Sequence, residues 1–269
     1  MTAIQARATY VSSTASRVSF VRQLRSEFVK LLSVRGTWWS VVIVAVLTLG
    51  IGVLLAANFP EGMGDPIMIV VSPVQFTMML AGILGVISVT GEYSTGMIRS
   101  TLAANPVRGS VLAAKAAVLA VFMFVVSLVI FIAAALIVTP FLAANDLAFD
   151  WADPSATILP IVAASATMSL FALIGVGLGF LLRSGAGAIA ATVGIIFVLP
   201  VILTLLSSFL PDLTWLIDVA NHLPASVAPS AILPTEGQAV SAGASWLTLG
   251  AWAAAALAAG WVVLRGRDA

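Results

Sequence analysis

Residues 111–139 read VLAAKAAVLAVFMFVVSLVIFIAAALIVT and carry a single charged side chain, Lys115. A helix that crosses a membrane needs about 20 predominantly apolar residues, so this run is long enough. Lys115 lies in the first turns of the run, where a long side chain can extend toward the membrane surface. The run therefore predicts a spanning helix with Lys115 reaching to the interface.

Five further runs have the same character, and none of them contains Asp, Glu or Arg. They cover residues 38–57, 67–90, 157–182, 186–210 and 244–264. Over all 269 residues, 61% are hydrophobic and 9% are charged, against about 25% charged in an average soluble domain. This composition excludes a soluble enzyme and a nucleic-acid-binding protein. It predicts an all-α integral membrane protein with six transmembrane helices.

The charged residues divide cleanly once six spans are drawn. All twelve basic residues fall on one side of the membrane: Arg7, Arg17, Arg22, Arg25, Lys30, Arg35, Arg99, Arg108, Lys115, Arg183, Arg265 and Arg267. The other side holds eight acids and no basic residue: Glu61, Asp65, Asp146, Asp150, Asp153, Asp212, Asp218 and Glu236. By the positive-inside rule both termini are cytoplasmic, so we expect a multi-pass protein of the plasma (inner) membrane.

The N-terminal segment precedes the first span and has its own pattern. We expect residues 1–36 to form a cytoplasmic tail and an amphipathic helix, and residues 37–266 to form one six-helix domain. In 19–34, SFVRQLRSEFVKLLSV, apolar residues gather on one helical face and polar residues, Lys30 among them, on the other. Such a helix lies in the membrane interface with its basic face toward lipid headgroups. Its charged residues are Arg22, Arg25, Glu27 and Lys30. The pattern fits a membrane anchor, or a lever that also touches a cytoplasmic partner.

The connection between the second and third spans is longer than a helical hairpin needs. It reads GEYSTGMIRSTLAANPVRGSVLAAK over residues 91–115. Residues 94–104 can form a short helix with Glu92 near its N-terminus, where a carboxylate suits the helix dipole, and Pro106 would end it. Arg99 and Arg108 supply basic contacts. A solvated loop is the plainer alternative.

Two features concern the later spans. Pro200 lies midway along the fifth run, where it frees the carbonyl of Ile196 and should kink the helix, so it is the candidate hinge. The glycines of the fourth run at 175, 177 and 179 permit close helix approach and are interpreted as packing positions. After the fifth run we expect a short external helix capped by Asp212. The proline-rich residues 223–238 argue against a long regular helix.

The stretches 25–39, RSEFVKLLSVRGTWW, and 91–115 resemble ABC-2-type transporter permeases of the single-domain, six-helix kind found in actinobacteria. The resemblance implies that residues around 92–108 form a coupling helix seated on a separate cytoplasmic ABC ATPase subunit. It assigns the pattern Glu92, Tyr93 and Gly96, together with Arg99 and Arg108, to that contact. It also implies short or re-entrant external helices before the last span, and a second permease copy as homodimer or heterodimer.

Several kinds of chemistry find no support in the residues. There is no Walker A motif, no cysteine and one histidine, so we expect no ATP hydrolysis, no cofactor and no metal site in this chain, with ATP held by the partner subunit. The expected function is ATP-driven export of a hydrophobic or amphipathic compound such as a drug, peptide or lipid. A secondary carrier or channel, a membrane enzyme, and a non-transporting assembly or sensory subunit stay open as alternatives. Buried charges would favour the carrier.

Overall fold

The structure, a computed structural model, describes residues 19–58, 65–105 and 107–266. Helices are the only regular secondary structure in this part of the chain. In chain order they are α1 (Phe20–Ser33), α2 (Arg35–Ala57), α3 (Ile67–Val71), α4 (Val74–Ser94), α5 (Met97–Ala104), α6 (Arg108–Ala143), α7 (Ile158–Leu182), α8 (Gly185–Val193), the π-helical turn η1 (Gly194–Val198), α9 (Leu199–Phe209), α10 (Thr214–Asn221), α11 (Pro224–Ile232) and α12 (Ala242–Gly266).

Within the described residues, six helical stretches are long and apolar enough to cross a membrane, which confirms the predicted number of spans. They are α2, α3 with α4, α6, α7, α8 through α9, and α12. Their bounds follow the predicted runs closely, because a backbone in lipid must satisfy every N–H and C=O within its own helix. The chain is therefore a multi-pass membrane protein by the length and composition of its helices.

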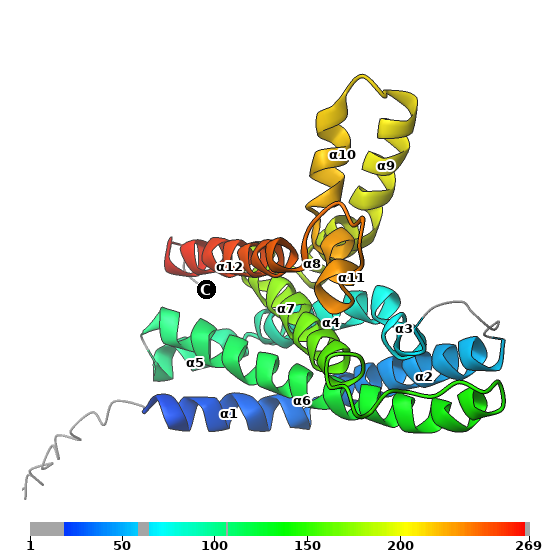
Figure 1. Ribbon diagram of the computed structural model, residues 1–269. Coiled ribbons are helices and arrows are strands. Elements are labelled where there is room, and N and C mark those ends of the chain that lie inside the picture. Colours follow the sequence, from blue (N-terminus) through cyan, green and yellow to red (C-terminus); the bar gives the residue numbers. More distant parts are fainter. Residues whose placement is uncertain (1–18, 59–64, 106, 267–269) are drawn as a thin grey trace, which may run out of the picture.

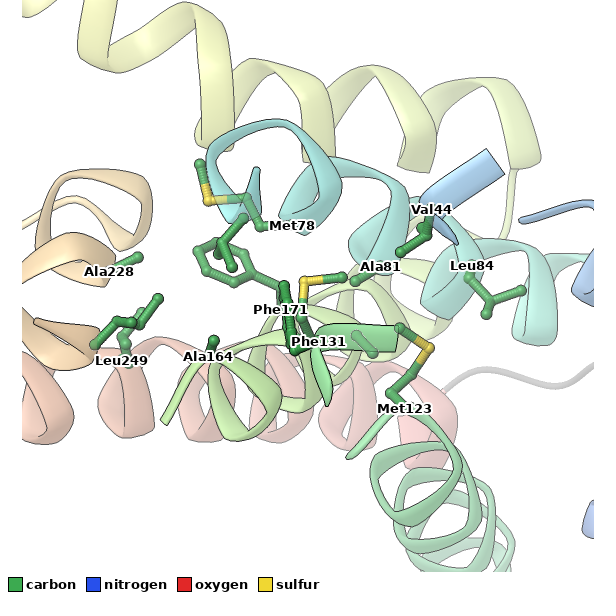
Figure 2. Packing of buried hydrophobic residues seen from close by; sticks show 14 of the residues in the cluster. Val44, Met78, Ala81, Leu84, Met123, Phe131, Ala164, Phe171, Ala228 and Leu249 are labelled. Atoms are coloured by element: carbon green, nitrogen blue, oxygen red, sulfur yellow. The ribbon is translucent and has the colours of Figure 1, made fainter. Parts of the chain in front are cut away.

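Helix α7 forms the centre of the bundle, since 78% of the residues in its 18-residue apolar stretch are buried. It packs against α4, α6 and α12. Figure 2 shows Phe171 of α7 beside Met78 of α4 and Phe131 of α6, with Leu249 of α12 nearby. Phe131, Phe171 and Leu249 are fully buried, so these three interfaces form one apolar core.

Small residues allow α7 to approach its neighbours closely. A Cβ on Gly175 would collide with the backbone of Gly82 in α4. A Cβ on Gly177 would collide with the backbone of Ala256 in α12, and Gly260 faces Gly177 in turn. The prediction that the glycines of the fourth span serve helix packing is confirmed.

The fifth span is interrupted where Pro200 predicts an irregularity. The Leu199 N–H donates to the Gly194 carbonyl, five residues back, so one π-helical turn precedes the proline. Beyond it α9 pairs with α10 through Leu203 and Leu216, and Figure 1 shows these two helices extending away from the other spans. Only 11% of the most apolar window of this span is buried, the smallest share among the six.

The segment between α9 and α12 forms two short helices. The predicted helix after the fifth span is α10, but its cap is wrong: Leu213 occupies the N-cap position and no side chain caps the helix. Within the proline-rich stretch, α11 is nine residues long and begins on Pro224, a position that proline tolerates because the first helical N–H needs no partner.

Candidate functional site

Four charged side chains meet where α1, α4 and α6 come together, and we call them the charge cluster: Glu27, Lys30, Glu92 and Lys115. The Lys115 ammonium lies 2.6 Å from Glu27 Oε2 and 2.8 Å from Glu92 Oε1. The Lys30 ammonium lies 2.8 Å from Glu27 Oε1 and 3.1 Å from Glu92 Oε1. Each lysine therefore bridges the same two carboxylates, and the cluster is electrically neutral.

Both ammonium groups use their full donor capacity of three. Lys115 donates its third hydrogen bond to the Ser88 carbonyl at 3.1 Å, and Lys30 donates its third to Thr101 Oγ1 of α5 at 3.3 Å. The two lysines differ in exposure, with 25% of the Lys30 side chain accessible against 6% for Lys115. Lys115 is thus the enclosed centre of the cluster and Lys30 its outer member.

The surroundings shift the pKa values of the two α1 residues in opposite directions. Burial disfavours the charged form of Glu27, but Lys115 and Lys30 outweigh it and hold the pKa of Glu27 below its ordinary value. Burial likewise opposes the charge on Lys30, but Glu27 and Glu92 raise the pKa of Lys30 above its ordinary value. The pairing therefore favours the charged forms of both residues.

Helix α1 turns a partly polar stripe toward the rest of the protein. It buries Gln23, Glu27 and Leu31, which follow one another at four-residue spacing, while Phe20 and Phe28 are exposed. The expectation that Lys30 turns toward lipid headgroups is wrong, because its ammonium is engaged by the two glutamates. Arg22 and Arg25 are exposed, as expected for the polar face.

A second polar contact holds α1 against the same region. Asn105 Nδ2, just after α5, donates to Gln23 Oε1 at 3.0 Å and to Ser110 Oγ of α6 at 2.9 Å. Asn105 Oδ1 accepts the Val107 N–H at 3.1 Å. The asparagine therefore links α1, the end of α5 and the start of α6.

Glu92 lies in the last turn of α4. The sequence pattern instead predicts it at the start of the next helix. It is 3% exposed and its carboxylate faces Lys115 instead of capping α5. The predicted short helix exists as α5 but begins at Met97, because Gly96 adopts φ +72°, which suits glycine and ends the preceding turn. The second span therefore extends beyond the predicted run 67–90 and includes one acid, Glu92, which pairs with Lys115 inside the protein.

The remaining predicted residues separate into two groups. Arg99 of α5 is exposed, and Ile98 beside it is buried. Arg108 donates from Nη1 to the Leu264 carbonyl at 2.9 Å, so it contacts the C-terminal end of α12. Pro106, the predicted end of the short helix, lies outside the described residues.

Tyr93 belongs to a neighbouring contact on the other side of α4. Its ring meets Phe180 edge-on at 6.4 Å, and the Arg183 guanidinium stacks over it at 5.4 Å. Arg183 Nη2 also donates to the Val263 carbonyl at 2.8 Å. Arginines at the start of α6 and the end of α7 thus both bind carbonyls at the end of α12, where positive charge complements the helix dipole.

A cavity of about 430 Å³ adjoins the charge cluster. The cluster forms its polar end, and its apolar wall comes from α1, α4 and α6 through Leu31, Leu84, Ile87, Val118 and Leu119. A second cavity of about 560 Å³ lies near the opposite end of the spans, between the start of α4 and α11. Among the described residues there is no group of three His, Cys, Asp or Glu side chains that could hold a metal ion.

The charge cluster was missed in the sequence, although a signal for it exists. Eight of the eleven acids lie on the side without basic residues, which leaves three, Glu27, Glu92 and Asp268, on the basic side. A lysine inside an apolar run needs a counterion. Glu27 and Glu92 were therefore the available partners for Lys115.

Comparison with protein-family models gives no match for this chain, and comparison with curated proteins gives none either.

Proposed function

We propose that the chain is the membrane-spanning permease subunit of an ATP-driven ABC transporter of the ABC-2 type. The observation that carries the proposal is the linkage of α1 and α5 to the spans α4 and α6 through the charge cluster and Asn105. These contacts join two short helices and two spans into one unit. Such a unit can transmit a push from a cytoplasmic partner into the bundle.

The route of that push follows from the contacts. Helix α5 is a short element with one buried side chain, Ile98, and an exposed Arg99. Its Thr101 accepts from Lys30, and the turn at Gly96 continues directly into α4. A displacement of α5 would therefore reach α4 through the backbone, and α1 and α6 through the ion pairs.

In this proposal the residues assigned to coupling have two different roles. Arg99 is the docking residue, since its side chain is exposed on α5. Glu92 and Arg108 act within the chain, because Glu92 pairs with Lys115 and Arg108 binds the end of α12. The ATPase subunit holds the ATP, and a second permease copy completes the transport path.

Helix α1 fits an interfacial position in the inner membrane, with both termini in the cytoplasm. Three kinds of residue occupy three sides of it: Gln23 and Glu27 face the protein, Phe20 and Phe28 are exposed and apolar, and Arg22 is exposed and charged. A helix at a membrane surface beside its own bundle meets protein, lipid and water in this way. The proposed cargo is a hydrophobic or amphipathic compound moved outward.

A proton- or ion-coupled carrier is the second candidate, because buried ionisable residues inside spans are typical of carriers. Lys115 and Glu92 are such residues. Both lie within two turns of a helix end, however, and each also pairs with a residue of α1, outside the spans: Lys115 with Glu27 and Glu92 with Lys30. This position favours a role in holding the helices together over a role in an ion pathway through the bilayer.

The test is co-expression with the ATPase encoded by a neighbouring gene, followed by purification through a tag on this chain and measurement of ATP turnover. We expect a complex with two copies of each subunit, and no turnover by this chain alone. Arg99→Glu should reduce retention of the ATPase, whereas Arg265→Glu, exposed at the end of α12, should not. ATP hydrolysis by the isolated chain, or uptake driven by an ion gradient without ATP, would overturn the proposal.

A further inference from the structure

The cavity beside the charge cluster combines a charged end with an apolar body. Its volume of about 430 Å³ lies within the range of about 300–1,000 Å³ typical of small-molecule sites. The charge cluster lines one part of the cavity, and the rest is lined by leucine, isoleucine and valine side chains together with Thr37, Ser88, Gly91, Ser94, Thr95 and Met97. A ligand that fits this lining has one polar group at the end of an apolar chain.

The carboxylate of Glu92 has an unused acceptor. Both lysines donate to Oε1, while the buried Oε2 has no hydrogen-bond partner among the described residues. Leaving a buried acceptor unsatisfied is costly, and more so for a charged group. The polar end of the cavity therefore favours a hydrogen-bond donor over an acceptor.

Lys30 is the member of the cluster that can leave. Its side chain is 25% exposed, and its three hydrogen bonds, at 2.8, 3.1 and 3.3 Å, are longer than those of Lys115, at 2.6, 2.8 and 3.1 Å. If the Lys30 side chain turns outward to water, Glu27 and Glu92 keep only Lys115 between them. The cluster then carries one net negative charge and accommodates one ammonium group in the position of the Lys30 ammonium.

We infer that the cavity binds primary alkylammonium amphiphiles, whose ammonium group replaces that of Lys30 between Glu27 and Glu92 while the alkyl chain lies along Leu84, Ile87 and Leu119. The exchange conserves charge, because one ammonium leaves as another enters. The incoming ammonium can donate to Glu92 Oε1 as the Lys30 ammonium does. The suggestion that such cations are transport substrates rests on the proposed function, whereas binding to the cavity does not.

The test uses the absence of cysteine from the chain. Ser94 lines the cavity and is exposed, so Ser94→Cys introduces a single thiol at its rim. In phosphatidylcholine nanodiscs, dodecylammonium should slow alkylation of this thiol by N-ethylmaleimide. Dodecyltrimethylammonium, which has no N–H group, and dodecanol, which has no charge, should require at least about tenfold higher concentrations, since a hydrogen bond to a charged group corresponds to about that factor.

Three variants in this background should change the dodecylammonium concentration for half-protection differently: one lowers it, one raises it and one leaves it unchanged. Lys30→Gln removes the competing ammonium and should lower the dodecylammonium concentration for half-protection about tenfold, while Glu92→Gln should raise it about tenfold. Arg25→Gln is the matched control, since it removes the same charge from an exposed position of the same helix, and should leave the concentration unchanged. Because every nanodisc has the same lipid, partitioning of the amphiphile cancels between variants.

Equal protection by all three amphiphiles would overturn the inference and leave the cavity as a place for lipid acyl chains. Unchanged or weaker protection in Lys30→Gln would overturn the exchange with Lys30. The amphiphile comparison in the chain with Lys30 in place decides the matter even if that variant does not fold. Binding without stimulation of ATP turnover in the complex would count against the transport role alone, and loss of the ATPase partnership would leave the binding result intact.

Discussion

Replacing Lys115 by methionine tests whether the charge cluster holds α1, α4 and α6 together. Methionine keeps the length of the side chain but removes the ammonium that donates to Glu27, Glu92 and the Ser88 carbonyl. Two buried carboxylates then share Lys30 alone. Removing one partner of a buried ion pair costs about 3–5 kcal/mol.

Proton uptake sets an upper limit to that cost. At pH 7.5 a carboxyl with the ordinary pKa of 4.5 is three pH units above its pKa. Protonating it there costs about 4 kcal/mol, at roughly 1.4 kcal/mol per unit. The folded variant then binds one proton more than the unfolded chain, so its stability falls as the pH rises. The deficit relative to the parent should therefore shrink by up to about 1.4 kcal/mol for each unit of acidification toward pH 5.

The assay is unfolding by sodium dodecyl sulfate in mixed micelles, followed by the fluorescence of the seven tryptophans. Arg99→Met, at an exposed position of α5, is the control and should stay within about 0.5 kcal/mol of the parent. Adding Glu27→Gln to the Lys115 variant restores neutrality and should recover about 2 kcal/mol. A loss below about 1 kcal/mol at pH 7.5, or a deficit independent of pH, would refute the reasoning.

Three further predictions concern packing, pH and topology. Gly175→Ala should destabilise the protein by about 3 kcal/mol in the same unfolding assay, because the added Cβ meets backbone, whereas Gly250→Ala, where nothing lies within 4 Å, should not destabilise it. Because the pKa of Glu27 is lowered in the fold, its contribution to stability is present above pH 4.5 and lost as the pH falls further, so the unfolding midpoint should drop as the pH falls below 4.5. Single cysteines at Asp150 and Arg99 should react with an impermeant maleimide in intact cells only at Asp150, and labelling at Arg99 would contradict the orientation.

Hydropathy predicted the spans well because their lengths and compositions are imposed by the bilayer. The run 111–139 lies inside α6, and the short helix after Gly96 ends at Ala104 as expected. The irregularity at Pro200 was also predictable, since proline removes a hydrogen bond wherever it occurs in a helix. Each of these features depends on residues close in sequence.

The charge cluster could not be read from the same periodicity because its members are far apart. Lys115 is 23 residues from Glu92 and 88 residues from Glu27. Their contact depends on how α1 packs against α6, and the polar stripe of α1 looked equally suited to water. Because Glu92 and Lys115 lie near helix ends, the sequence alone was compatible with either exposure or burial. They are buried because α1 packs against α4 and α6.

The central position of α7 has a consequence for the order in which the chain can assemble. Its partners α4 and α6 are synthesised before it, but α12, whose Ala256 and Gly260 lie against Gly177, is synthesised well after it. Until α12 is made, the side of α7 that carries Gly177 lacks the helix against which it packs in the finished fold. The span α12 therefore belongs to the core and not to its edge, so a ribosome that stops before residue 242 leaves an unfinished fold in the membrane.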